Sequence, residues 1–150
     1  MATVEMSFTP LPAHVRTARL VATAVARRSG VDEALLDEVR LAVGEACSRA
    51  VEAHQEHCPA EPVRVALTGT DGRFEVVVTD TAVQHNGAAD AAVTGGGAND
   101  GSETPGGEPQ ALPAELGLAV IEGLADDVEI ARTQAGLSIR MSWPSAHAAS

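Results

Sequence analysis

Glu45 and Arg49 carry opposite charges four residues apart, at the margin of an apolar stripe with helical spacing. On a helix, an acid that lies four residues before a base forms an ion pair that stabilises the helix by about 0.2–0.5 kcal/mol. We therefore expect Glu45 and Arg49 to pair with each other. Their spacing alone assigns them no further role.

Asp80 and Gly117 are two further positions where chemistry could take place. Asp80 ends a predicted strand next to a glycine-rich segment, where its carboxylate serves either as a turn residue or as a hydrogen-bond acceptor in a pocket. Gly117 lies at the start of a predicted helix, where backbone N–H groups can approach an anion. A single glycine in such a place specifies little.

His54, His57 and Cys58 cluster after the second predicted helix, but no fourth residue has the spacing of a zinc ligand. A surface loop is the simpler interpretation, and we assign no metal site. Cys47 and Cys58 are too few for a disulfide framework. Neither has the basic neighbours that lower a thiol pKa, so we expect inert thiols.

The overall charge excludes several classes of function. The 150 residues include ten Arg, no Lys and 21 acidic residues, which gives a formal charge of −11. Such a chain is unsuited to bind DNA directly, and without lysine it cannot form a Walker-type phosphate loop. No apolar run is long enough to span a bilayer and no leader peptide is recognisable, so we expect a cytoplasmic protein.

Four arginines form a basic ridge on the first predicted helix of this acidic chain: Arg16, Arg19, Arg27 and Arg28. A charged helix face is usually just a solvated face. The alternative is a docking surface for an acidic partner.

The length of the chain predicts one domain over residues 1–150. Helical spacing after Pro12, after Val31 and near residues 116–124 alternates with period-two runs, and Asp71-Gly72 is a hairpin signal. The order strand, two helices, two strands, helix, two strands predicts an α+β two-layer sandwich. Its sheet is about five-stranded, largely antiparallel and mixed, with three helices on one face. Residues 81–113, rich in Gly and Pro, form either a functional lid or a disordered segment.

The order of these elements and of their motifs is similar to that in one protein family. Essentially the whole chain resembles the bacterial anti-sigma factors of the histidine-kinase-like (GHKL) ATPase superfamily. These serine kinases control sigma factors by partner switching. Leu41-Ala42-Val43-Gly44-Glu45-Ala46-Cys47-Ser48-Arg49 is similar to their nucleotide-binding helix, Val78-Thr79-Asp80 to the strand that ends in the adenine-binding Asp, and Glu115-Leu116-Gly117-Leu118 to their second glycine box.

The resemblance implies a Bergerat-type fold and roles for particular residues. It makes Glu45 the general base, Asp80 the adenine contact and Gly117 a phosphate-loop glycine. Arg49 stands where the family has the asparagine that holds Mg²⁺, and Glu115 stands where it has a glycine. Because a guanidinium has no lone pair for a cation, the resemblance implies a degenerate site that binds ATP and Mg²⁺ weakly, if at all. Arg49 would contact phosphate directly or clamp Glu45.

Two functions follow from the resemblance. The first is an anti-sigma protein that binds a sigma factor, an anti-anti-sigma switch protein or both, with little phosphotransfer. Its partner contacts would be Arg16 and Arg19, because Arg19 matches a partner-binding arginine of the family. The second is an active serine kinase that phosphorylates the switch protein with Glu45 as its base. The resemblance also implies a homodimer.

Overall fold

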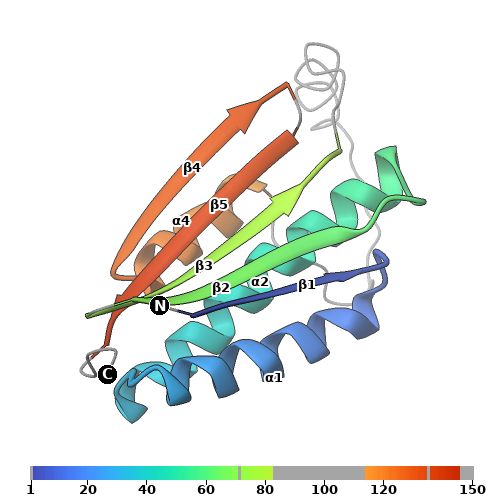
Figure 1. Ribbon diagram of the computed structural model, residues 1–150. Helices are drawn as coiled ribbons and strands as arrows, with labels where there is room; N and C mark the ends of the chain where they lie inside the picture. Colours follow the sequence, from blue (N-terminus) through green and yellow to red (C-terminus); the bar gives the residue numbers. More distant parts are fainter. Residues whose placement is uncertain (1, 71, 83–113, 135, 146–150) are drawn as a thin grey trace, which may run out of the picture.

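In the computed structural model, the described residues form a five-stranded sheet that three helices cover on one face (Figure 1). Residues 2–70, 72–82, 114–134 and 136–145 are described. The elements are β1 (Ala2–Phe8), α1 (Pro12–Arg28), α2 (Glu33–His57), β2 (Val63–Thr70), β3 (Arg73–Asp80), α4 (Ala114–Leu124), β4 (Asp127–Thr133) and β5 (Gly136–Pro144). The predicted element order is confirmed.

The strand order in the sheet is β1-β2-β3-β5-β4. All four neighbouring pairs among the described strands are antiparallel. The largely antiparallel sheet that we expected is confirmed, but the parallel pair of a mixed sheet is not found among these strands. β5 lies between β3 and β4, and its register places Leu137 opposite Asp80. The chain therefore returns from α4 through the edge strand β4 to the side of β3.

The core lies between the sheet and the helices, as the period-two pattern requires. In β3 the residues at even-numbered positions from Phe74 to Asp80 are buried, while their neighbours are half-buried on the other face. Trp143 and Phe74 are the largest buried side chains, and their rings lie 6.3 Å apart between centroids. The apolar faces of α1, α2 and α4 cover this side of the sheet.

Local signals set the ends of the two long helices. Pro12 occupies the first turn of α1, where no N–H partner is needed, and Gly30 follows the helix with a φ of 93° that favours glycine. Asp32 caps α2, because its Oδ1 accepts a hydrogen bond of 3.0 Å from the Ala34 N–H. α2 then runs through the middle of the helical layer.

Two expectations concern other parts of the chain. The Gly/Pro-rich lid predicted at about residues 81–113 lies, from residue 83 onward, outside the described residues. Within the described part, no helix is both long enough and apolar enough to cross a membrane.

Candidate functional site

Arg49 and Asp80 form an ion pair between the helical layer and the sheet. Arg49 Nη1, on α2, lies 3.3 Å from Asp80 Oδ2 at the end of β3. The two side chains are only 18% and 4% exposed. A pair this well shielded from water is screened less than a surface pair, so each charge depends strongly on the other.

The second oxygen of Asp80 shapes the chain after β3. Asp80 Oδ1 accepts a hydrogen bond of 3.1 Å from the Ala82 N–H, which closes a turn of the kind that aspartate favours. Both interpretations of Asp80 from the sequence therefore hold. It is a turn residue and also an acceptor in the wall of a cavity.

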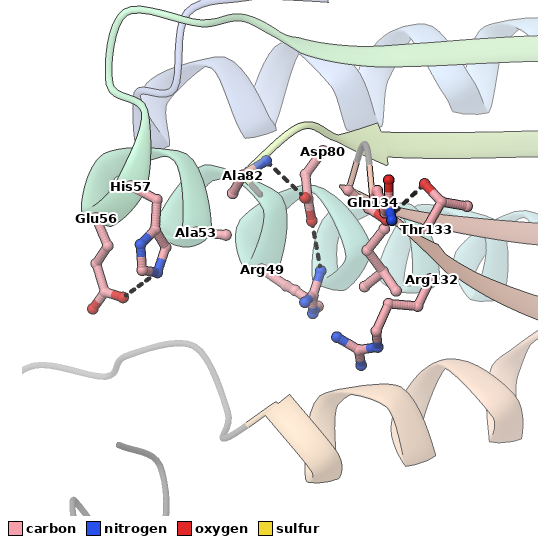
Figure 2. Close-up of a pocket in the computed structure, with 11 residues that line it drawn as sticks. Arg49, Ala53, Glu56, His57, Asp80, Ala82, Arg132, Thr133 and Gln134 are labelled. Atoms are coloured by element: carbon pink, nitrogen blue, oxygen red, sulfur yellow. Dashed lines mark hydrogen bonds and ion pairs between the residues drawn. The ribbon is translucent and has the colours of Figure 1, made fainter. Parts of the chain in front are cut away.

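A cavity of about 280 Å³ lies beside this ion pair (Figure 2). The end of α2, the end of β3 and the β4–β5 turn surround it. Figure 2 shows Arg132 of β4 extending toward Arg49 from the other side of the cavity. The residues that line the cavity are Arg49, Ala53, Glu56, His57, Asp80, Ala82, Arg132, Thr133, Gln134, Gly136 and Leu137.

The ion pair that we expected between Glu45 and Arg49 is not formed. Arg49 pairs with Asp80, and Glu45 Oε2 is buried without a hydrogen-bond partner. Burial therefore raises the pKa of Glu45 above its ordinary value of 4.5. Glu45 also does not line the cavity. A clamp of Arg49 on Glu45 is thus excluded in this structure, and Oε2 of the predicted base has no hydrogen-bond partner among the described residues.

His54 holds the segment that follows Asp80. Its ring is fully buried; Nδ1 donates to the Glu61 carbonyl at 2.9 Å, and Nε2 accepts from the Thr81 N–H at 2.9 Å. One donor and one acceptor contact match the neutral ring in a single tautomer. His54 therefore links α2 to the segment that follows β3. In the described residues, no group of three His, Cys, Asp or Glu side chains could hold a metal.

Gly136 allows β5 to approach the backbone of Asp80. Its φ is 137°, and a Cβ built there would lie 1.9 Å from the Asp80 carbonyl oxygen. Any side chain would therefore push β5 away from Asp80 and open the cavity wall. The following residue, Leu137, is buried and lines the cavity.

The structure describes the other predicted site residues to different extents. Glu115 and Gly117 lie in the first turn of α4, and their side chains are not among those described. Arg16 is exposed on α1, as predicted, whereas Arg19 is half-buried, so the ridge is less uniformly solvated than its spacing indicates. The two thiols are free, and burial raises the pKa of Cys47 to about 12.

Two residues of this site were not identified from the sequence: His54 as a support for the segment after β3, and Arg132 as part of the cavity wall. Gly136 has a sequence signal, because a glycine that opens a strand often marks close backbone approach. Leu137, just after it, is the position where the family resemblance expects a threonine near the adenine. Arg132 has no sequence signal, since only strand pairing brings it opposite Leu137 and so to the cavity.

Comparison with known proteins agrees with this architecture. A crystal structure of the RsbU and RsbW domains of Rv1364c from Mycobacterium tuberculosis is similar, with a TM-score of 0.63 and 17% sequence identity. The similarity covers 99% of this chain but 34% of that one, so this chain spans about a third of its length. No curated protein sequence matches.

At 17% identity this similarity establishes the fold alone, whereas a match to a family model establishes the family. The model of the histidine kinase-like ATPase domain matches residues 8–143, which include α2, the ion pair and the cavity. The chain therefore belongs to the histidine kinase-like ATPase domain family.

Proposed function

We propose that this protein is an anti-sigma regulator that acts by partner switching and binds nucleotide weakly or not at all. It binds a sigma factor, an anti-anti-sigma switch protein or both. The observation that carries the proposal is the ion pair between Arg49 and Asp80. It joins the two positions that the family resemblance assigns to the metal and to adenine, and so occupies both with groups of the protein itself.

The first reason lies in Asp80. In an active site of this type the carboxylate must be available to the amino group of adenine. Here Oδ2 faces Arg49 and Oδ1 accepts from the Ala82 N–H. A base would have to compete with Arg49 for a carboxylate that is 4% exposed, and separating a buried ion pair leaves a charge without compensation.

The second reason lies in the metal. A magnesium ion requires oxygen ligands, and a guanidinium supplies only N–H donors. Arg49 therefore does not fit the role of a ligand, and its positive charge opposes a cation at that place. Arg132 extends toward the same space and adds a second positive charge. The two arginines thus oppose Mg²⁺ at this place.

The partner surface that we propose lies on the helical layer, away from the cavity lining. Arg16 and Arg19 of α1 present positive charge there on a chain whose formal charge is −11. Local charge of opposite sign to the whole molecule directs an acidic partner to one place. This surface does not require nucleotide in order to bind.

Calorimetric titration with ATP, with and without Mg²⁺, tests the nucleotide half of this proposal. We expect no heat at high micromolar ATP for the wild type. Arg49→Asn removes the guanidinium from Asp80 and supplies an amide oxygen, so this variant is expected to gain Mg²⁺-dependent binding by at least tenfold. Micromolar, Mg²⁺-dependent binding by the wild type would contradict a degenerate site.

A second titration tests the proposed binding of a sigma factor or a switch protein. Purified sigma factors and switch proteins of the source organism are titrated against the wild-type protein, with and without ATP. We expect one of them to bind in the absence of nucleotide. If none binds under either condition, the anti-sigma assignment is wrong, whatever the ATP titration shows.

An active serine kinase is the second candidate, and Glu45 is the observation that favours it. Its Oε2 has no hydrogen-bond partner among the described residues, and burial raises the pKa of Glu45, as suits a general base. Transfer of ³²P from labelled ATP to the bound switch protein tests this function. A signal that Glu45→Ala abolishes, while Glu45→Ala keeps the ATP affinity of the wild type, would establish the kinase.

A further inference from the structure

We infer that Gly44 of α2 is the positioning residue for Arg19, so that the docking surface is formed by α1 and α2 together. This inference rests on the proposed function, because it takes Arg19 as a partner contact. It goes further in stating how the structure holds that arginine and which second helix takes part.

The side chain of Arg19 lies across α2 at the one position without a Cβ. A Cβ built on Gly44 would be 2.6 Å from Arg19 Cδ and 3.3 Å from Arg19 Cγ, and 3.5 Å from Nη1. Contacts below 3.0 Å require atoms to move. Since Gly44 is buried and Arg19 is half-buried, the aliphatic stem of the arginine supplies the cover over this glycine.

Gly44 lowers the stability of its helix, and the contact with Arg19 accounts for a glycine at this position. Gly44 lies inside a helix of 25 residues, where glycine is less favourable than alanine by about 1 kcal/mol. Its backbone has no positive φ that would demand glycine. The close approach of Arg19 is therefore the structural reason for its presence.

The contact with Gly44 restricts the conformations that the Arg19 side chain can adopt. A stem that packs against α2 has fewer rotamers open to it before any partner arrives, so less conformational entropy is lost on binding. Its charge also reaches α2, where it acts to lower the pKa of Cys47 against the larger effect of burial. The cation is thus placed over the junction of the two helices.

Two large apolar side chains are exposed on the same two helices. Leu20, which follows Arg19 in α1, is 61% exposed, and Leu41, one helical turn before Gly44 in α2, is 54% exposed. Arginine is among the residues that most often dominate binding energy at interfaces. The partner that fits is a protein segment that carries a carboxylate for Arg19 and apolar residues for the leucines.

Gly44→Ala is the test, with Gly123→Ala as its matched control. Gly123 lies on α4, and a Cβ built there would meet nothing within 4 Å. The probe is the sigma factor or switch protein that binds the wild type in the titrations above. We expect Arg19→Ala to weaken binding at least tenfold and Gly44→Ala to weaken it about fivefold to tenfold, whereas Gly123→Ala leaves it unchanged.

Two readouts separate positioning from structural damage. Gly44→Ala is expected to leave the Tm unchanged or to raise it by up to about 3 °C, because alanine favours the helix. The double variant Arg19→Ala/Gly44→Ala is expected to bind no more weakly than Arg19→Ala alone. A lower Tm for Gly44→Ala, or full additivity of the two losses, would show that Gly44 does not act through Arg19.

The outcomes also distinguish the inference from the function on which it rests. If Arg19→Ala weakens binding and Gly44→Ala binds as the wild type does, the inference is wrong and the anti-sigma function stands. If Arg19→Ala binds as the wild type does, Arg19 is no partner contact and the inference is again wrong, although the function stands. If no probe binds the wild type, both are overturned.

Discussion

Arg49 and Asp80 are 31 residues apart in the chain, yet their side chains meet at 3.3 Å in the wall of the cavity. The pair links α2 to the end of β3. It also takes the place of the i, i+4 pair between Glu45 and Arg49 that the sequence indicates. Because the pair is largely buried, removing one partner leaves the other charge without its main compensation.

Arg49→Ala is therefore expected to lower the free energy of unfolding by about 3 kcal/mol at neutral pH. Arg40→Ala is the matched control on the same helix. Its ion pair with Asp37, at 2.8 Å, is 46% and 76% exposed, so that its loss costs at most about 0.5 kcal/mol. Urea denaturation of both variants measures the difference. Equal losses would mean that the Arg49 pair behaves as a surface pair.

Glu45→Gln is expected to stabilise the protein at neutral pH. The pKa of Glu45 is raised above 4.5 by burial, so the native state keeps its proton at pH values where the unfolded chain has released it. Stability from this group is thus present below pH 4.5 and is lost as the pH rises through the raised value. Thermal unfolding from pH 4 to pH 8 measures the difference. An advantage of the variant that does not shrink toward pH 4 would contradict this assignment.

Gly136→Ala is expected to lower the free energy of unfolding by about 3 kcal/mol or more, because a Cβ there overlaps the Asp80 carbonyl oxygen at 1.9 Å. Gly72→Ala is the control. Its φ is 80°, but a Cβ would meet nothing within 4 Å, so the cost is the backbone strain of about 1 kcal/mol. Chemical denaturation compares the two, and a similar loss in both would show that β5 can yield.

Cysteine labelling is expected to separate the two thiols. Cys47 is fully buried with a pKa of about 12, so at pH 8 only about one molecule in 10⁴ carries the thiolate. Cys58 is half-buried, and its pKa is also raised, by burial first and by Glu61 and Asp80 next. Mass spectrometry after treatment with iodoacetamide should find slow labelling of Cys58 and none of Cys47. Labelling of Cys47 without denaturant would indicate that α2 opens.

The elements of the fold could be predicted from the sequence because each has its own period. Val63, Val65 and Leu67 alternate with polar or smaller residues, and the structure buries all three on the helical side of β2. Pro12, Gly30 and Asp32 mark helix ends through local backbone chemistry. Such signals act over a few residues, so they are readable without knowledge of the rest of the chain.

The contacts of the site could not be predicted in this way. Helical spacing brings Glu45 within reach of Arg49, but only tertiary packing places Asp80 where a shielded partner is available, and the arginine pairs there. Strand order likewise decides that Arg132 borders the cavity. The sequence by itself determined the elements and the family motif positions, because these depend on local periods. The tertiary structure decided which charges meet, because pairing energy depends on distance and burial between segments far apart in the chain.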